Sequence, residues 1–168
     1  MPDTSPLTAT NTTDLPRVRH LVWLMRAYTV CYACFFLCVL FAEPQVYALL
    51  ENNRQMLGIG APAGDAPPIA VWKYVAVGYI ATLGLYSYWT QADPVRGKVF
   101  VQLMVYGKFV AGALMVGHFW VAGGVTAFLL SGLSDVAMGV VALIFLERAF
   151  PGTARRLLSM RPLNESDQ

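Results

Sequence analysis

Apolar residues in this chain are gathered into four long blocks, separated by polar segments or segments rich in Gly and Pro. Each block is about 20 residues or slightly longer, the length that an α-helix needs to cross ~30 Å of hydrocarbon at 1.5 Å per residue. None of them alternates between apolar and polar positions, as membrane strands do. The pattern therefore predicts four transmembrane helices, at about 21–42, 69–89, 99–121 and 125–146.

Helix-breaking residues fall between these blocks. They are Pro44, Pro67-Pro68, Asp93-Pro94, Gly123-Gly124 and Pro151-Gly152. Short connections make consecutive helices antiparallel neighbours. The predicted fold is all-α, an integral membrane four-helix bundle with up-down-up-down topology. The helical domain spans 17–150, between a disordered N-terminal tail at 1–16, rich in Thr, Ser and Pro, and a C-terminal tail at 151–168.

Basic residues are distributed unequally between the two sides of this bundle. The termini and the second loop carry most of them, namely Arg17, Arg19, Arg26, Arg96, Lys98, Arg148, Arg155, Arg156 and Arg161. The opposite side has only Arg54 in the first loop and Lys73 just inside the next helix. The positive-inside rule then places both termini in the cytoplasm. We expect a multi-pass protein of a bacterial inner (plasma) membrane.

The first loop, at 43–68, is predicted to lie outside the cell. Its first half could form a short amphipathic helix, with Val46, Leu49, Leu50 and Met56 toward one side. Its second half, 58–68, is rich in Gly, Ala and Pro and reads as irregular. Two interpretations stay open for this loop, a surface connector and a lid over the bundle.

The composition supports the membrane assignment. Only 13% of the residues are charged and 57% are hydrophobic, whereas a soluble domain carries about 25% charged residues. A chain with so few charges cannot cover a soluble surface with polar groups. The net charge of +2 is too small to indicate nucleic-acid binding, so the expected partner is the lipid bilayer, with other membrane subunits or a second copy of the chain as further possibilities.

Two ionisable residues fall inside the predicted helices, Lys108 in the third and Asp135 in the fourth. Counted from the Gly123-Gly124 turn, they lie about 15 and about 12 residues away, so their depths differ by only ~4–5 Å. Small residues around both positions allow the two helices to approach closely. We therefore predict a buried Lys108–Asp135 ion pair. Either the pair fixes the helix register, or it belongs to a proton- or ligand-responsive site.

Further polar residues could extend such a site toward the cytoplasm. Arg26, Gln102 and Tyr86 are the candidates, and Tyr86 shares a stripe of the second helix with Tyr79 and Thr82. Arg26 and the tyrosines also have simpler explanations, because an arginine near a helix end can reach the interface and tyrosines anchor helices there.

Cysteine and histidine offer little support for a cofactor. Cys31, Cys34 and Cys38 share one stripe of the first helix, a spacing that suggests thiol or soft-metal handling. Cysteine also packs as a small hydrophobe, and no second cysteine pair exists to relay metal or electrons. His20 and His118 are predicted at opposite membrane faces and cannot share a haem. No cofactor or metal is expected, and no catalytic motif is present.

The stretch Tyr86-Ser87-Tyr88-Trp89-Thr90-Gln91-Ala92-Asp93-Pro94, followed by Gly107-Lys108 and by Asp135, resembles the small DoxX-like membrane proteins of bacteria. The resemblance covers roughly residues 70–140. It implies a four-helix membrane protein with both ends in the cytoplasm. Most such proteins have no assigned activity, and some of the broader group look like accessory subunits of respiratory or redox systems.

Three functions follow from these observations. The first is a non-enzymatic membrane protein, an accessory or assembly subunit in which the Lys108–Asp135 pair is structural. The second is a small transporter or permease that uses the same pair in its translocation site. The third is a thiol or soft-metal handler that works through Cys31, Cys34 and Cys38.

Overall fold

The structure, a computed structural model, describes residues 16–60, 70–121 and 124–158. In these ranges the chain forms six helices: α1 (Pro16–Phe41), α2 (Glu43–Leu57), α3 (Ala70–Ala92), α4 (Pro94–Val121), α5 (Thr126–Ala149) and α6 (Thr153–Leu158). The predicted disorder of the N-terminal tail and most of the predicted irregular segment at 58–68 lie outside the described residues.

Three of these helices are long and apolar enough to cross a membrane. They are α1, α4 and α5, and within the described ranges they alone meet both conditions. Large apolar side chains are exposed along them, including Val30, Leu114 and Leu133, as contact with lipid tails requires. The chain is therefore a helical membrane protein. The fourth predicted span, which corresponds to α3, stays a prediction: α3 has 23 residues but does not belong to this apolar set.

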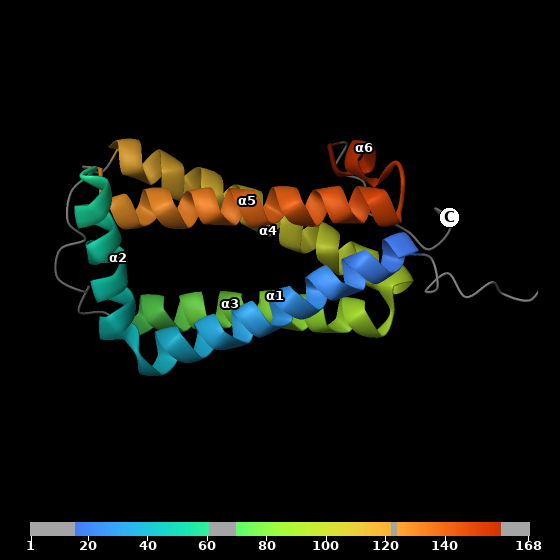
Figure 1. The fold of residues 1–168 in the computed structure, drawn as a ribbon, viewed down its shortest axis with the longest axis horizontal. Coiled ribbons are helices and arrows are strands. Elements are labelled where there is room, and N and C mark those ends of the chain that lie inside the picture. The colour runs from blue at the N-terminus through green and yellow to red at the C-terminus, as the bar shows by residue number, and fades with distance from the viewer. Residues whose placement is uncertain (1–15, 61–69, 122–123, 159–168) are drawn as a thin grey trace, which may run out of the picture.

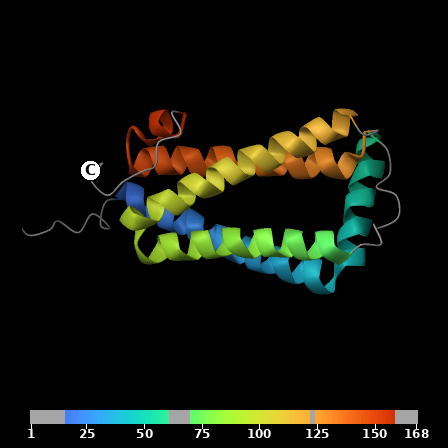
Figure 2. The same cartoon turned by 180° about the vertical axis from the view of Figure 1, so that it is seen from behind.

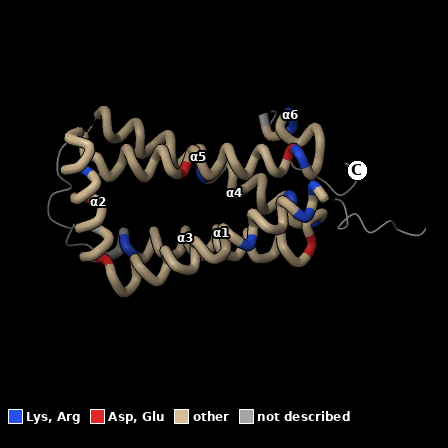
Figure 3. Tube along the Cα trace, viewed as in Figure 1, with Lys and Arg blue, Asp and Glu red and all other residues tan. Residues whose placement is uncertain are grey.

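The long helices are arranged as two pairs, α1 with α3 and α4 with α5 (Figures 1 and 2). The pairs lie close together at the end that carries α6, and they diverge toward the other end. There α2 runs across the bundle from the end of α1 to the start of α5, and it contacts both. Figure 3 shows that Lys and Arg positions gather at the α6 end and are sparse along the long helices.

Helix α2 occupies the first half of the predicted outer loop. It begins at Glu43 because Pro44, in its first turn, has no N–H to lose and a backbone angle suited to a helix start. It ends at Gly58, whose φ of 64° is the left-handed conformation of a helix cap. Just beyond, the Thr126 hydroxyl of α5 donates a hydrogen bond to the Ile59 carbonyl. The first half of the predicted loop is thus a helix that follows α1 directly and is hydrogen-bonded to α5 just past its other end.

The start of α4 differs from the prediction. The helix begins at Pro94, not near residue 99, so Arg96 and Lys98 lie in its first turns and not in a loop. The reason is a helix cap, since the Asp93 carboxylate accepts hydrogen bonds from the backbone N–H groups of Val95 and Arg96, each at 3.1 Å. Asp93-Pro94 is therefore a tight turn that starts a helix as well as ending one. Helix α1 likewise begins earlier than predicted, at Pro16.

Helix α6 lies in the region predicted as a tail. Both carboxylate oxygens of Glu147 hold its first turn, accepting hydrogen bonds from the N–H of Gly152 at 2.7 Å, the hydroxyl of Thr153 at 3.0 Å and the N–H of Ala154 at 2.7 Å. At its far end the Tyr106 hydroxyl of α4 donates to the Leu157 carbonyl at 2.5 Å. The Leu157 side chain is buried in the core. Six residues make too short a helix to persist alone, and these contacts hold it in place.

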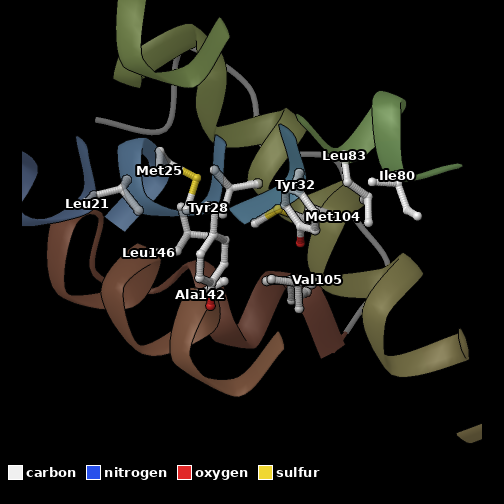
Figure 4. Close-up of a cluster of buried hydrophobic side chains, with 12 residues drawn as sticks. Leu21, Met25, Tyr28, Tyr32, Ile80, Leu83, Met104, Val105, Ala142 and Leu146 are labelled. Atoms are coloured by element: carbon white, nitrogen blue, oxygen red, sulfur yellow. The ribbon is translucent and has the colours of Figure 1, made fainter. Parts of the chain in front are cut away.

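The core lies where the two helix pairs meet (Figure 4). Its buried side chains come from all four long helices and from α6: Leu21, Met25, Tyr28 and Tyr32 from α1, Ile80 and Leu83 from α3, Val101, Met104 and Val105 from α4, Ala142 and Leu146 from α5, and Leu157 from α6. In Figure 4 the rings of Tyr28 and Tyr32 extend from α1 into this cluster. The core therefore joins the two pairs in the half of the bundle nearer to α6.

Candidate functional site

The predicted ion pair is present in the interior of the bundle. The Lys108 ammonium donates a hydrogen bond to Oδ1 of Asp135, and only 7% and 15% of the two side chains are exposed. A charge in such a place is costly unless it is paired and hydrogen-bonded. Lys108 and Asp135 satisfy each other's charge within the chain, and their contact joins α4 to α5.

Glycine residues allow the two helices to come close enough for this contact. A Cβ added to Gly112 would lie 2.6 Å from Cγ2 of Val136, and one added to Gly132 would lie 2.9 Å from the Gly112 carbonyl oxygen. At Gly139 the added atom would lie 3.3 Å from Cβ of Lys108. Small residues at such crossings let helix backbones approach in lipid. The position of the ion pair is thus set by backbone packing on both sides of it.

A third helix contributes an aromatic ring to the site. The Lys108 ammonium lies 5.2 Å from the centroid of the Tyr32 ring on α1, within the range of a cation–π attraction. The Tyr32 ring meets Tyr28 edge to face, with centroids 6.0 Å apart. Tyr28 donates a hydrogen bond to the Met138 carbonyl of α5 at 2.8 Å, whereas the buried Tyr32 hydroxyl has no hydrogen-bond partner among the described residues.

Tyr32 is a residue that the sequence analysis misses. The available signal is the spacing of Tyr28 and Tyr32, which are four residues apart and therefore on one face of α1. Tyr79 of α3 also approaches the site, because its hydroxyl lies 3.0 Å from the place that a Cβ on Gly107 would take. A side chain of α1 therefore lies beside Lys108, and one of α3 lies beside the residue that precedes it.

The other predicted polar residues have contacts of their own. The Arg26 guanidinium lies 5.1 Å from the Trp23 ring centroid on the same helix, and Arg26 is exposed. The Tyr86 ring stacks on Phe100 with centroids 5.4 Å apart. The buried side chain of Gln102 donates a hydrogen bond to the Tyr106 hydroxyl at 3.4 Å. None of these three contacts joins Arg26, Tyr86 or Gln102 to the Lys108–Asp135 pair.

The three cysteines lie on the outside of the bundle. Cys31, Cys34 and Cys38 are free thiols and are exposed on α1, on a different face from the buried Tyr28 and Tyr32. Across the described part of the chain, no three His, Cys, Asp or Glu side chains are grouped so as to hold a metal ion.

An apolar cavity of about 560 Å³ lies between α1, α2 and α5. Most of its lining residues belong to α2, namely Val46, Leu49, Leu50, Asn53, Met56 and Leu57, and the others are Phe35 of α1 and Leu130, Ser131 and Ser134 of α5. The four α2 residues that the sequence groups on one side are all among them. Ser131 and Ser134 stand four and one residues before Asp135 on α5, so the cavity approaches the ion pair from the α2 end.

A second lysine is buried near the α6 end. Lys98 is 2% exposed, and its ammonium lies 5.7 Å from the centroid of the Phe150 ring. No carboxylate pairs with it within the described ranges. Among the described residues the two buried lysines of α4 therefore differ, because Lys108 has an anionic partner and Lys98 has an aromatic one.

Comparison with known proteins adds no relative to this description. No protein-family model, curated protein or solved structure matches the chain. The site is therefore interpreted from its own geometry, and the resemblance to DoxX-like proteins stays a prediction.

Proposed function

We propose that this chain is a non-enzymatic protein of a bacterial inner membrane with four transmembrane helices, α3 being the fourth. Helix α3 packs along α1 and α4, two helices that are themselves apolar enough to span. Its one charged residue, Lys73, is near its outer end and pairs with Glu43 at 2.8 Å. A charge at that level stays within reach of the membrane surface, so it is compatible with a span.

The orientation proposed places the α6 end in the cytoplasm. Arg17, Arg148 and Arg155 belong to the helix ends gathered there, together with further Lys and Arg positions (Figure 3). The α2 end carries Arg54, which pairs with Glu51 at 2.5 Å. This asymmetry follows the positive-inside rule and supports cytoplasmic termini.

The proposed role is that of an accessory or assembly subunit of a membrane complex, in which the Lys108–Asp135 pair holds the bundle together. The observation that supports this role is that Lys108 has its partners within the chain. Its ammonium contacts the Asp135 carboxylate of α5 and lies over the Tyr32 ring of α1. Such a pair has no need of a ligand to be stable. Some of the broader group to which a DoxX-like resemblance points look like accessory subunits, although most DoxX-like proteins have no assigned activity.

Co-purification tests this role. The full chain, tagged at its C-terminus and expressed at native level, is expected to be isolated in mild detergent with one stoichiometric membrane partner. The Lys108→Met/Asp135→Leu double variant is expected to retain that partner, since the pair is architectural. The accessory role would be contradicted if the full chain were isolated without a partner, both from mild detergent and from native membranes.

The cavity beneath α2 favours a second candidate, a small transporter. Ser131 and Ser134 extend the cavity lining to within one turn of Asp135, and the Tyr32 hydroxyl beside the pair is unpaired among the described residues. In this alternative the pair would open to admit a ligand. Solute flux into proteoliposomes distinguishes the transporter from the accessory subunit. A transporter should lose its flux in the folded Lys108→Met/Asp135→Leu variant, whereas an accessory subunit should show no flux even in the parent protein.

A further inference from the structure

A small cavity with basic walls lies at the α6 end of the bundle, away from the Lys108–Asp135 site. Its volume is about 260 Å³. It is formed between the start of α1 and the end of α5, and its lining residues are Arg17, His20, Phe145, Glu147, Arg148 and Pro151. Two helices distant in sequence thus bring two guanidinium groups and an imidazole to one hollow.

The one acidic residue of this cavity offsets only part of its positive charge, because a single carboxylate, Glu147, stands against the guanidinium groups of Arg17 and Arg148. Both oxygens of Glu147 accept hydrogen bonds from the first turn of α6, so the carboxylate is committed to that helix. Neither Arg17 nor Arg148 forms an ion pair within the described ranges. The N-terminus of α1, which begins at Pro16, adds the positive end of a helix dipole. The hollow therefore favours an anion.

Its position points to the kind of anion. Arg17 lies in the first turn of α1 and Arg148 in the last turn of α5, where two apolar spans reach the level of lipid headgroups. Phe145 supplies an apolar wall on the side of the hydrocarbon. Guanidinium groups bind phosphate oxygens through paired N–H donors. Basic pockets between transmembrane helices on the cytoplasmic side bind anionic headgroups for these reasons.

We propose that the cavity formed by Arg17, His20 and Arg148 binds the phosphate of an anionic phospholipid from the surrounding leaflet. The two arginines hold the phosphate, His20 adds an N–H donor, and the acyl chains run down the apolar surface of α1 and α5. This site rests on the proposed orientation, with the α6 end in the cytoplasm, and it is independent of the role of the Lys108–Asp135 pair.

Native mass spectrometry of the full chain in detergent tests the proposal, with phosphatidylglycerol, phosphatidylcholine and inorganic phosphate titrated separately. Phosphatidylglycerol is expected to bind more tightly than phosphatidylcholine. Each of Arg17→Gln and Arg148→Gln should weaken it by about fivefold, the factor for losing one arginine near an anionic headgroup. The matched control is Arg155→Gln, which removes an exposed arginine of α6 that lies outside the cavity lining and should leave the affinity unchanged.

A double variant that retains both charges separates a loss of binding from a loss of folding. The Arg17→Lys/Arg148→Lys variant keeps the cationic site and should keep most of the preference for phosphatidylglycerol. Equal binding of the two lipids to the parent would overturn the proposal, as would an equal loss in Arg155→Gln, which would indicate a diffuse charge effect. Displacement of phosphatidylglycerol by millimolar inorganic phosphate would identify a site for free phosphate and would also overturn it.

Discussion

Lys108 and Asp135 form an ion pair that joins the middle of α4 to α5, with 7% and 15% of the two side chains exposed. In hydrocarbon an isolated charge is far less stable than a paired one, so each residue depends on the other. The glycine-lined crossing of α4 and α5 keeps the two backbones close. The packing and the electrostatics of this interface therefore support each other, and each can be tested separately.

Widening the α4–α5 crossing should destabilise the bundle. Gly112→Val places new atoms against Val136 and the Gly132 backbone, since a Cβ alone would lie 2.6 Å and 2.9 Å from them. We expect a loss of about 1–3 kcal/mol in the free energy of unfolding, typical of overpacking, measured by denaturant titration in detergent. The matched control is Gly117→Val on the same helix, where nothing lies within 4 Å of an added Cβ. Equal losses in the two variants would contradict this account of the interface.

The two core tyrosines should respond differently to removal of the hydroxyl. Tyr28→Phe loses the hydrogen bond to the Met138 carbonyl and should cost about 0.5–1.5 kcal/mol. Tyr32→Phe removes a buried hydroxyl without a partner in the described structure while keeping the ring beside Lys108, so stability should be unchanged or slightly higher. Thermal melting in detergent measures both. A larger loss in Tyr32→Phe than in Tyr28→Phe would show that the Tyr32 hydroxyl has a partner in the membrane.

The two buried lysines of α4 should also differ. Lys98→Met removes a buried charge whose contact is the Phe150 ring, and leaves no carboxylate unpaired within the described ranges. Lys108→Met leaves the Asp135 carboxylate without its partner. We expect the first variant to melt within a few degrees of the parent and the second to melt far lower. Similar large losses in both would mean that Lys98 has an anionic partner in the assembled protein.

Glu147 should control the docking of α6 and not the stability of the spans. Glu147→Gln replaces an acceptor of three hydrogen bonds with an amide that has one acceptor oxygen. Hydrogen exchange of residues 153–158 should become faster, while the melting temperature of the bundle stays close to that of the parent. Glu51→Gln on α2 is the control. Unchanged exchange at α6 would show that Leu157 and Tyr106 suffice to hold this helix.

Part of this structure could be predicted from the sequence. Lys108 and Asp135 lie at similar numbers of residues from the Gly-Gly sequence between their helices, so their similar depth in the membrane follows from helix geometry alone. Hydropathy gives α1, α4 and α5 because these three helices have the length and composition of a span. Both inferences use only local spacing, and both concern neighbouring helices.

The remaining features depend on contacts between distant segments. Tyr32 faces Lys108 only because of the rotation of α1 against α4, which no local pattern specifies. The sequence pattern places Lys98 in a loop, whereas in the structure it is buried and its ammonium lies 5.7 Å from the ring of Phe150, the residue that follows α5. Helix α6 exists through Glu147 and Tyr106, which lie outside it. Rotation and long-range capping are set by the tertiary structure, and for that reason the sequence pattern alone misses them.

The most direct test of the central claim is a double-mutant cycle on the ion pair. Lys108→Met and Asp135→Leu should each lower the free energy of unfolding by about 3–5 kcal/mol, because each leaves one buried charge unpaired. The double variant should recover most of that loss, giving a large coupling energy between the two positions. If the three variants instead unfold like the parent, the pair does not hold α4 to α5, and a binding or transport role for Lys108 and Asp135 becomes the better explanation.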